Sequence, residues 1–369
     1  MTTPLRSDEW SIIERLLPAG WEDAARACGA FRRRRYTQEP RDLLRLLLFH
    51  AVSGTGMRAT MAQAAAAGLS TASDVALLKR MRTSVEWLRW IAAGLCDRLR
   101  SEVHVPQGLR LRVIDSTTIQ GPAAKSSEWR LHYTLDLCHL ACDWHELTGA
   151  RTAEALERAP VARGDVILGD RNFLRTTGVR AVAQRGGHVV IRMRWTHPHL
   201  ENEHGQPVQA LTRARHLRVG HAGDWPVRLV EAKHAPIAGR LVALRLPLPL
   251  AQQAQRRVQR RAVRKQNATD SRSLEAAQYV LLFTTLSSEQ LDAEGVLELY
   301  RFRWQVEIAF KRYKQLLALG RLPHQDPRAA QAWILAKLVI ALLLETLYRN
   351  ERAISPWGYA LGIQRRIAA

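Results

Sequence analysis

The sequence predicts a mixed α/β fold with helical segments at both ends of the chain. Helical patterning with capping residues and glycine stops fills the amino-terminal part, up to about residue 100. Alternation of polar and apolar residues begins at residues 109–121 and recurs in the segments that follow, as in half-buried strands. A short apolar strand at residues 165–170 then precedes another helical pattern. This order predicts an antiparallel meander followed by an α/β crossover.

Two of the amino-terminal helices resemble a DNA-binding motif. Helices are expected at residues 7–17, 41–54, 57–69 and 73–95. The last two are joined by a glycine turn and resemble a helix-turn-helix. Lys79, Arg80 and Arg82 lie on the second helix of this pair and are expected to contact DNA. Plain packing of two basic helices is the alternative, because helical hairpins with basic faces are common.

The middle of the chain alternates between strands and helices. Strands are expected at residues 109–121, 128–137, 141–149, 165–170, 188–195, 225–233, 240–248 and 278–286, with helices at 151–159 and 175–186. Residues 252–267 are polar and strongly basic, which predicts a solvated helix face or flexible arm, or a segment that follows phosphates. A long helix follows from about residue 299, and the last helix opens at Asp326 and Pro327.

The charge balance points to a polyanionic partner. The 369 residues are enough for two or three domains, and 55 basic against 34 acidic residues give a net charge of +21. An excess of this size repels itself unless a polyanion neutralises it, and nucleic acid is the usual partner. A GC-rich genome also raises the arginine content, so the charge alone leaves this partner open.

The cysteines and the apolar segments indicate an intracellular protein without a membrane anchor. Four irregularly spaced cysteines are too few for a disulfide framework, which fits a reducing cytosol. Cys138 and Cys142 have histidines nearby but no second ligand pair at finger spacing, so zinc is disfavoured. No signal peptide opens the chain, and the apolar stretch at residues 332–348 contains Lys337 and is too short to span a membrane. A buried helix is expected there.

Six residues form the candidate site. On one continuous helix, Tyr300, Arg303, Glu307 and Lys314 fall within about 60° of one another and form a polar stripe. Asp115 lies where the alternating pattern meets the run Ser116–Thr118, at or near a strand end, and Asp170 ends the apolar strand at residues 165–170. Taken alone, the stripe also fits an exposed helix with an Arg303–Glu307 ion pair, and each aspartate fits a turn or a helix cap. Together, three acids among cations suit a site for hard divalent cations and phosphates.

These residues also match the motifs of a known family. Residues 300–314 match the Tyr-Arg-Glu-Lys signature of the insertion-sequence-4 group of bacterial DDE transposases at every spacing. The runs VIDSTTI and GDRNF, at residues 113–119 and 169–173, resemble its first and second acidic motifs. Asn172 stands where the group usually has glycine, in a turn that asparagine also tolerates. The resemblance extends from the amino-terminal helices to about residue 359.

The resemblance implies a ribonuclease-H-like catalytic core interrupted by a β-rich insertion. The implied domains are an amino-terminal helical DNA-binding domain (1–105), the core (106–186 and 274–320), a basic insertion (187–273) and a carboxy-terminal helical segment (321–369). In this arrangement Asp115, Asp170 and Glu307 bind the metal ions. Tyr300, Arg303 and Lys314 hold the phosphates of the transposon end.

The chemistry implied by the resemblance is metal-dependent cleavage and strand transfer at the ends of an insertion sequence. Two Mg²⁺ ions, which Mn²⁺ can replace, activate water or a DNA 3′-hydroxyl. A hairpin intermediate with a flipped base is also implied, and Trp195 and Trp225 are candidates to stack on that base. The expected partners are double-stranded transposon-end and target DNA and a second copy of the chain. No membrane or small-molecule substrate is expected, and the expected location is the bacterial cytoplasm, at the nucleoid.

Two other functions compete with this one. A non-catalytic DNA-binding remnant or regulator would keep the basic helices but lose the acids, and all three acids are present. A host nuclease with the same core would lack the four-residue signature. Relatives commonly continue with further helix beyond the SPWGY run at residues 355–359, and this helix often contributes to dimer contacts. The shorter end of this chain is therefore expected to weaken dimer contacts or activity.

Overall fold

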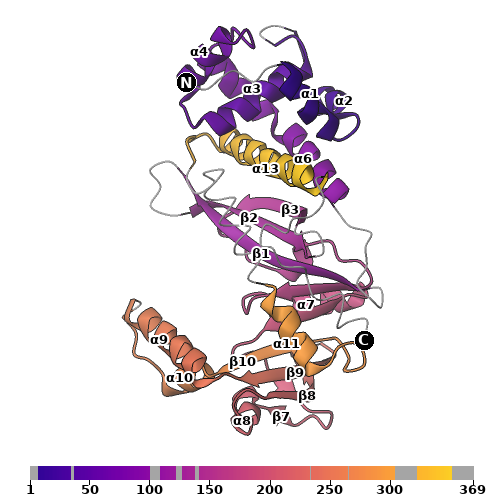
Figure 1. The fold of residues 1–369 in the computed structure, drawn as a ribbon, viewed down its shortest axis with the longest axis vertical. Coiled ribbons are helices and arrows are strands. Elements are labelled where there is room, and N and C mark those ends of the chain that lie inside the picture. The colour runs from indigo at the N-terminus through magenta and orange to yellow at the C-terminus, as the bar shows by residue number, and fades with distance from the viewer. Residues whose placement is uncertain are drawn as a thin grey trace. The chain divides into compact units, whose positions relative to one another are not determined.

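The fold comes from a computed structural model, shown in Figure 1. The described residues are 7–34, 37–99, 109–121, 127–137, 141–232, 234–264, 266–303 and 322–350. They divide into two compact units. The first unit takes its described residues from Met1–Glu102, Ser116–Ala153 and Glu307–Arg366, and the second takes them from Val103–Asp115 and Glu154–Val306. Strand β1 (Arg110–Gln120) therefore passes from the second unit into the first after Asp115.

Most of the first unit is helical. Its described helices are α1 (Ser7–Leu16), α2 (Trp21–Ala27), α3 (Pro40–Ser53), α4 (Met57–Ala66), α5 (Asp74–Thr83), α6 (Val85–Leu99) and α13 (Pro327–Asn350). Pro40 opens α3 within a capping box, and Gly54 ends it with a φ of 65°. The single helix expected at residues 73–95 is divided at Ser84, whose hydroxyl donates a hydrogen bond of 2.7 Å to the Arg80 carbonyl. A side-chain donor thus satisfies a carbonyl at the end of α5.

Helix α13 contains the most apolar stretch of the chain. Its residues Pro327–Leu347 are long and apolar enough to cross a membrane by length and composition, but 67% of the most apolar window is buried inside the protein. Helices α3, α5 and α6 pack against it. Lys337 is also buried, with its ammonium 4.3 Å from the ring centre of Trp333, and burial lowers the pKa of Lys337 to about 8. The expected buried helix is confirmed.

An antiparallel hairpin completes the first unit. It consists of β2 (Ser127–Asp136) and β3 (Ala141–Gly149), with an irregularity between Thr134 and Leu135. Helices α6 and α13 pack on β3, so the hairpin has one face covered by helices of its own unit (Figure 1). Both expected strands are confirmed.

The second unit is built on a mixed sheet with the strand order β1-β4-β5-β10-β9-β8-β6-β7. Its remaining strands are β4 (Asp165–Gly169), β5 (His188–Arg192), β6 (Leu200–Glu201), β7 (Pro207–Val208), β8 (Ala222–Leu229), β9 (Ile237–Arg245) and β10 (Tyr279–Thr284). The first three strands in this order run parallel, and every later pairing is antiparallel. Strand β5 pairs with β4 directly after the turn at Gly186 and Gly187. The parallel part of the sheet therefore continues past residue 187, the expected start of the insertion.

In the described part of the second unit one expected helix is absent, and the basic segment takes the helical form, one of the alternatives expected for it. The helices of this unit are η1 (Leu156–Arg158), α7 (Thr176–Gln184), α8 (Ala210–Arg215), α9 (Leu248–Arg264), α10 (Ser271–Ala276) and α11 (Ala293–Arg301). The prediction of a helix at residues 151–159 is wrong, because only the single 3₁₀ turn η1 forms there. The basic segment at residues 252–267 forms most of helix α9.

The continuous helix expected to carry the polar stripe is also interrupted. Helix α11 ends at Arg301, and the amides of Phe302 and Arg303 bond to carbonyls three residues earlier, at Leu299 and Tyr300. Bonds of this spacing tighten and close the last turn of a helix. Tyr300 therefore lies in the last turn of α11, and Arg303 lies in the turn beyond it. Glu307 and Lys314 lie outside the described residues.

A buried histidine pair makes the stability of the first unit depend on pH. His50 of α3 bonds through Nδ1 to Thr60 Oγ1 at 2.8 Å and through Nε2 to His324 Nε2 at 3.0 Å. Burial, followed by repulsion from His324, lowers the pKa of His50 to about 4. Burial also lowers the pKa of His324, against the opposing effect of Asp326. Both rings are therefore held neutral in the folded protein.

Acid is accordingly expected to destabilise the first unit. A histidine with its ordinary pKa of 6.5 binds a proton before His50 does, so the unfolded chain gains protons first as pH falls towards about 4. The free energy of unfolding then falls by up to about 1.4 kcal/mol per pH unit for this group. We expect His50→Gln to flatten the dependence, measured by urea unfolding between about pH 7.5 and about pH 5 with a probe in α3. Equal pH dependence in variant and wild type would contradict this role.

Candidate active site at the ends of two parallel strands

The pairing of β1 with β4 brings two acids together. Its register aligns Arg110 with Asp165 and Val113 with Leu168. Continued by two residues, the same register sets Asp115 opposite Asp170, the residue that directly follows β4. Residues opposite each other on parallel strands share a face of the sheet, and the strands lie about 4.8 Å apart. Asp170 directly follows β4, whereas Asp115 lies within β1, two residues beyond the last residue that pairs with β4, so the register places the two acids at equivalent positions.

A buried ion cluster beneath the site fixes this register. Asp165 accepts hydrogen bonds of 2.8 Å from both Nε and Nη2 of Arg110, and one of 3.1 Å from Nη1 of Arg112. All three residues are buried, and Arg112 also bonds to the Pro160 carbonyl. Burial opposes ionisation of Asp165, but the hydrogen bonds from Arg110 and the Ala162 amide, with the charge of Arg112, hold its pKa below the usual range.

The turn after β4 holds Asp170 through Asn172. The Asn172 amide donates a hydrogen bond of 2.7 Å to Asp170 Oδ1. Its side-chain Nδ2 donates to Glu154 Oε2 at 3.3 Å, and its Oδ1 accepts from Arg194 Nη2 at 3.0 Å. Glycine has no side chain for the last two contacts. The asparagine that departs from the family pattern therefore links this acidic turn to a cation that follows β5.

Two further expected site residues lie beside the aspartates. Arg303 Nη1 lies 3.9 Å from Asp115 Oδ2, and both side chains are about one-fifth exposed. The guanidinium of Arg303 also lies 6.0 Å from the ring centre of Tyr300. The Tyr300 hydroxyl is buried and has no hydrogen-bond partner among the described residues. Burial raises the pKa of Tyr300 to about 12, with Asp170 acting in the same direction and Arg303 and Arg192 against it.

Cations that the sequence reasoning missed surround Asp170. Arg192 lies at the exposed end of β5, and Arg194 follows two residues later. Desolvation, followed by repulsion from Arg261, Arg194 and Arg192, lowers the pKa of Arg171, although this residue keeps an exposed surface. The alternation of residues 188–195, with arginine at every second position from Arg192, was the available signal. It predicted a strand but not where the strand would lie.

The donor set suits a hard divalent cation. Asp115 supplies carboxylate oxygens from within strand β1 and Asp170 from directly after β4, and both residues are partly exposed. Among the described residues, no group of three histidine, cysteine or acidic side chains could hold a metal ion. Glu307, the expected third ligand, lies outside this part of the chain. The two aspartates therefore fit as a partial ligand set that needs a further oxygen donor.

The basic residues of the expected helix-turn-helix have structural contacts. Arg80 donates to the carbonyls of Ala30 and Arg33 at 3.1 and 3.2 Å. Arg82 donates two hydrogen bonds, of 2.7 and 3.0 Å, to Asp326 Oδ2. Lys79 is exposed on α5. Of the three expected DNA contacts, Arg80 and Arg82 therefore have partners within the first unit.

The structure also shows how the aromatic and cysteine candidates pack. The Trp225 ring lies over Gly223, where an added Cβ would meet it at 2.3 Å, so Trp225 is a packing residue. Trp195 is half-buried, with the Arg272 guanidinium 6.0 Å from its ring centre. Cys142 is buried with its sulfur 4.0 Å from that of Cys96. Cys138 and its neighbouring His139 lie outside the described residues.

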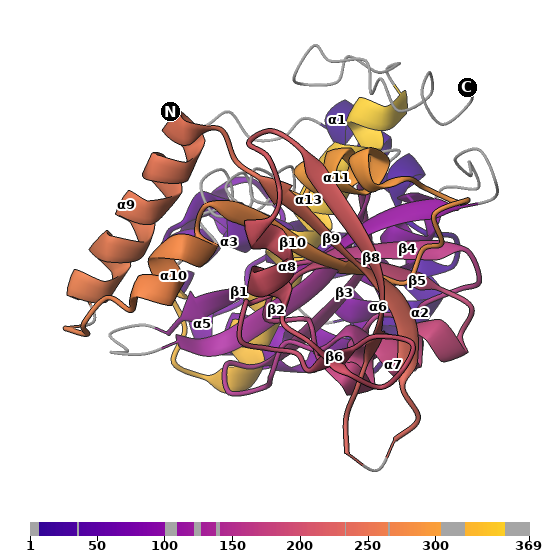
Figure 2. The same cartoon turned by 90° about the horizontal axis from the view of Figure 1, so that it is seen from below.

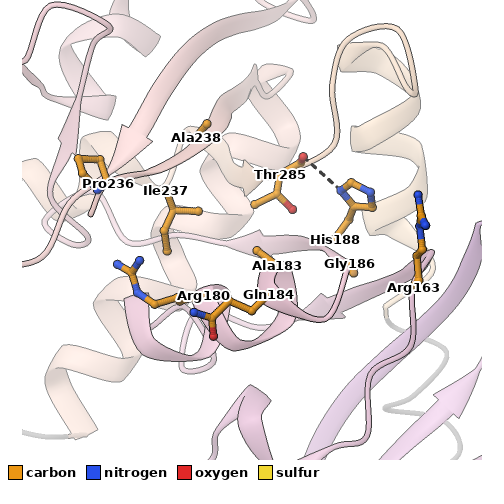
Figure 3. A pocket seen from close by; sticks show the side chains of 11 residues that line it. Arg163, Arg180, Ala183, Gln184, Gly186, His188, Pro236, Ile237, Ala238 and Thr285 are labelled. Carbon is orange, nitrogen blue, oxygen red and sulfur yellow. Dashed lines mark hydrogen bonds between the residues drawn. The ribbon is translucent and has the colours of Figure 1, made fainter. Parts of the chain in front are cut away.

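A pocket of the second unit lies away from these acids. It has a volume of about 660 Å³ and is lined by residues around α7, the start of β5 and the start of β9, including Arg163, Arg180 and His188 (Figure 3). His188 begins β5, whereas the candidate site lies at the carboxyl ends of the parallel strands. Neither aspartate lines the pocket, so it is not the candidate site.

Comparisons with known proteins agree on one family. The model of the family described as transposase DDE domain matches residues 106–344. The InsL transposase assigned to insertion sequence element IS186A of Escherichia coli strain K12 is 34% identical over 356 residues, covering 95% of this chain and 96% of its own. The transposase for insertion sequence element IS421 of Escherichia coli is 34% identical over 357 residues, with the same coverage. The solved piggyBac transposase synaptic complex with hairpin DNA aligns with 97% of this chain and 76% of its own, at a TM-score of 0.45 and 12% identity.

Proposed function

Since this chain belongs to the DDE transposase family, we propose that it cuts and rejoins DNA at the ends of an insertion sequence, using divalent cations held by Asp115, Asp170 and Glu307. The observation that carries the proposal is the register of the parallel strands β1 and β4, which places Asp115 and Asp170 at equivalent positions just beyond the paired residues, with Arg303 beside Asp115. Carboxylates brought together in this way repel each other, so a partly exposed pair favours a bound cation over a role in stability.

The metal ions would supply the activation of the nucleophile. Mg²⁺ suits a site made of oxygen ligands, and Mn²⁺ can replace it. Asp115, Asp170 and Glu307 would hold such ions, whose chemistry is to make water or a DNA 3′-hydroxyl more acidic and to neutralise charge on a leaving oxygen. Asp115 and Asp170 hold these ions from rigid strands, and Glu307 completes the set on the strength of the motif at residues 300–314. Lys314 enters the proposal in the same way, as a phosphate contact.

The protein's other groups would hold the DNA. Arg303 faces Asp115, and cations on the carboxylates would repel its guanidinium towards a phosphate oxygen. The Tyr300 hydroxyl stays protonated at neutral pH because its pKa is about 12, so it can donate to a second phosphate oxygen. Arg171, Arg192 and Arg194 add positive charge around Asp170. These contacts would fix the scissile phosphate without reading the base sequence.

The finer assignments extend the same proposal. We assign the chain to the insertion-sequence-4 group, with a ribonuclease-H-like core supported by the parallel order of β1, β4 and β5. Trp195 is the better candidate for stacking a flipped base in a hairpin intermediate, because the Trp225 ring already packs over Gly223. Lys79 is the better candidate of the three helix-turn-helix cations for contacting transposon-end DNA. The DNA-bound form would be a homodimer at the nucleoid, in the cytoplasm.

Cleavage of the element's own ends tests the proposal. Purified protein, Mg²⁺ and a duplex carrying the terminal inverted repeats are expected to give cuts at the element boundary. Chelation by EDTA abolishes these cuts, and Glu307→Gln reduces them by at least about 10²-fold because a metal ligand is lost. Unchanged cleavage by Glu307→Gln would remove this residue from the metal site.

The same assay separates the enzyme from a DNA-binding regulator. A regulator would bind the inverted repeats in a gel-shift assay but would leave them uncut with both Mg²⁺ and Mn²⁺. The presence of both strand-end aspartates favours the enzyme. Binding without cleavage by the wild-type protein would favour the regulator.

A further inference from the structure

Helix α9 carries an unusual concentration of arginine on one face. At about 100° per residue, Arg256, Arg257, Arg260, Arg261 and Arg264 fall within about 140° of one another. All five of these residues, called the arginine face below, are exposed. The least exposed residues of the helix lie on the opposite side: Ala251, Ala254, Gln255, Val258 and Ala262. The helix is therefore amphipathic, with a packed side and a side on which five arginines are exposed.

The packed side holds α9 against its own unit. Helix α10 lies beside α9 in both views of the fold (Figures 1 and 2) and contacts it, with a hydrogen bond of 3.1 Å from Gln255 Nε2 to the Leu274 carbonyl. An ion pair of 2.5 Å between Arg215 and Glu275 joins α10 to α8. The arginine face is thus displayed outward by a helix that has neighbours on its other side.

No acidic residue neutralises this face from within the helix. The segment Leu248–Arg264 contains no aspartate or glutamate. None of the five arginines forms an ion pair with any described residue of the chain. Like charges at spacings of three and four residues destabilise a helix, so this pattern costs stability in the isolated protein. A polyanion bound along the face would remove that cost.

The arginine face and both candidate aspartates belong to the second unit. The same unit carries further exposed arginines after β4 and at the end of β5: Arg171, Arg192 and Arg194. The second unit therefore offers guanidinium groups both on α9 and next to Asp170 in the chain.

The distribution of apolar residues on α9 argues against a membrane surface. A membrane-bound amphipathic helix needs a continuous apolar face. Leu248, Leu250 and Val263 are the large exposed apolar residues of α9. At about 100° per residue they are spread over about 200° of the helix, and Leu250 lies among the arginines. The chemistry of the exposed surface is that of a phosphate-binding helix.

We propose that the arginine face of α9 binds the sugar-phosphate backbone of the duplex DNA on which the second unit acts. This inference rests on the proposed function for the identity of the polyanion. The face extends about 12 Å from Arg256 to Arg264, enough for several successive phosphates. Guanidinium contacts to phosphate carry no sequence information, so α9 contributes affinity and orientation but not choice of sequence.

Salt-dependent DNA binding tests the proposal with a matched pair of variants. The test variant is R260Q/R264Q, which removes two charges one helical turn apart and leaves the other three arginines of the face in place. The control is R213Q/R218Q, which removes the same charge from two exposed positions at and after α8 in the same unit. Affinity for a labelled duplex carrying the element's end, and for a duplex of unrelated sequence, is measured over a range of NaCl concentrations.

The test variant is expected to bind both duplexes at least about 10-fold more weakly at moderate salt. Its slope of log affinity against log salt should fall by about 1.8, because each phosphate contact contributes about 0.9. The control variant should keep the wild-type slope and affinity. Equal slopes in the test variant and the wild type, or equal losses in both variants, would overturn the proposal.

The outcomes also separate this proposal from the proposed function. Normal cleavage by wild type together with an unchanged salt slope in the test variant would reject the role of α9 alone. A reduced slope in the test variant with no cleavage by wild type would support α9 and reject the catalytic function. If the test variant loses binding to vesicles of phosphatidylserine but not to duplex DNA, the polyanion is a membrane and the proposal fails.

Discussion

Replacing Asp115 or Asp170 by asparagine is expected to reduce cleavage of the element's ends by at least about 10³-fold, a loss of about 4 kcal/mol in transition-state stabilisation. Asparagine keeps the shape of the side chain but removes the charge that holds a hard cation. The loss should appear with Mg²⁺ at saturating concentration and should be smaller with Mn²⁺, which tolerates nitrogen and neutral oxygen ligands better. Single-turnover cleavage of a labelled duplex measures it directly.

The folded state should survive these two changes. Each removes one of two neighbouring negative charges, so thermal stability should stay equal to that of the wild type or rise. Glu289→Gln, at an exposed position of the same unit, is the matched control and should cleave like the wild type. Full cleavage by both Asp115→Asn and Asp170→Asn would show that these strand ends do not bind the catalytic cations.

The sequence predicted that Asp170 comes at the end of an apolar strand, because that signal is local. It placed Asp115 at or near a strand end, but β1 continues to Gln120, so Asp115 lies within the strand. The spacing of 55 residues between them equals the register offset between β1 and β4, which aligns Arg110 with Asp165. That equality could be recognised only after the strands were known to be parallel neighbours. Their proximity is a tertiary property that no local pattern contains.

The expectations that failed, and the residues that were overlooked, depended on structure that a local sequence pattern does not contain. The polar stripe assumed one helix from Tyr300 onward, and the closing turn at Phe302 and Arg303 breaks that assumption. Arg303 nevertheless reaches the candidate site, because the turn directs it towards Asp115. Arg192 was overlooked because its importance depends on β5 lying next to β4. The position of a residue such as Arg192 depends on which strands pair, and a pattern in a single sequence does not contain that information.

The cations around the site have two different roles, and the buried cations differ in role from the exposed ones. Arg110 and Arg112 are buried and bound to Asp165, so they stabilise the strand register. Arg192 and Arg194 are exposed near Asp170, where their guanidinium groups can contact the phosphates of bound DNA. Removing exposed cations should therefore change DNA affinity more than stability, and removing a partner of the buried cluster should do the reverse.

The second large effect is accordingly expected at Asp165. Asp165→Ala leaves the guanidiniums of Arg110 and Arg112 buried without their carboxylate, which typically costs about 3–5 kcal/mol. Because the pKa of Asp165 is held below its ordinary 3.8, its contribution is present above that pH and is lost as pH falls through the folded value. Hydrogen exchange of β1 and β4 peptides in increasing denaturant measures the loss in the second unit, without assuming that the whole chain unfolds in one step.

Two further variants distinguish a buried ion cluster from simple loss of packing. Glu275→Ala breaks an exposed ion pair with Arg215 in the same unit and should have a much smaller effect, because solvent screens that pair. The triple variant R110M/R112M/D165L replaces all three charges with apolar side chains and should be more stable than Asp165→Ala. If the triple variant is instead less stable than Asp165→Ala, the unpaired buried charge is not the cause of the loss. Its cleavage activity at low temperature then reports whether the register that sets Asp115 opposite Asp170 depends on this cluster or only on the strand pairing itself.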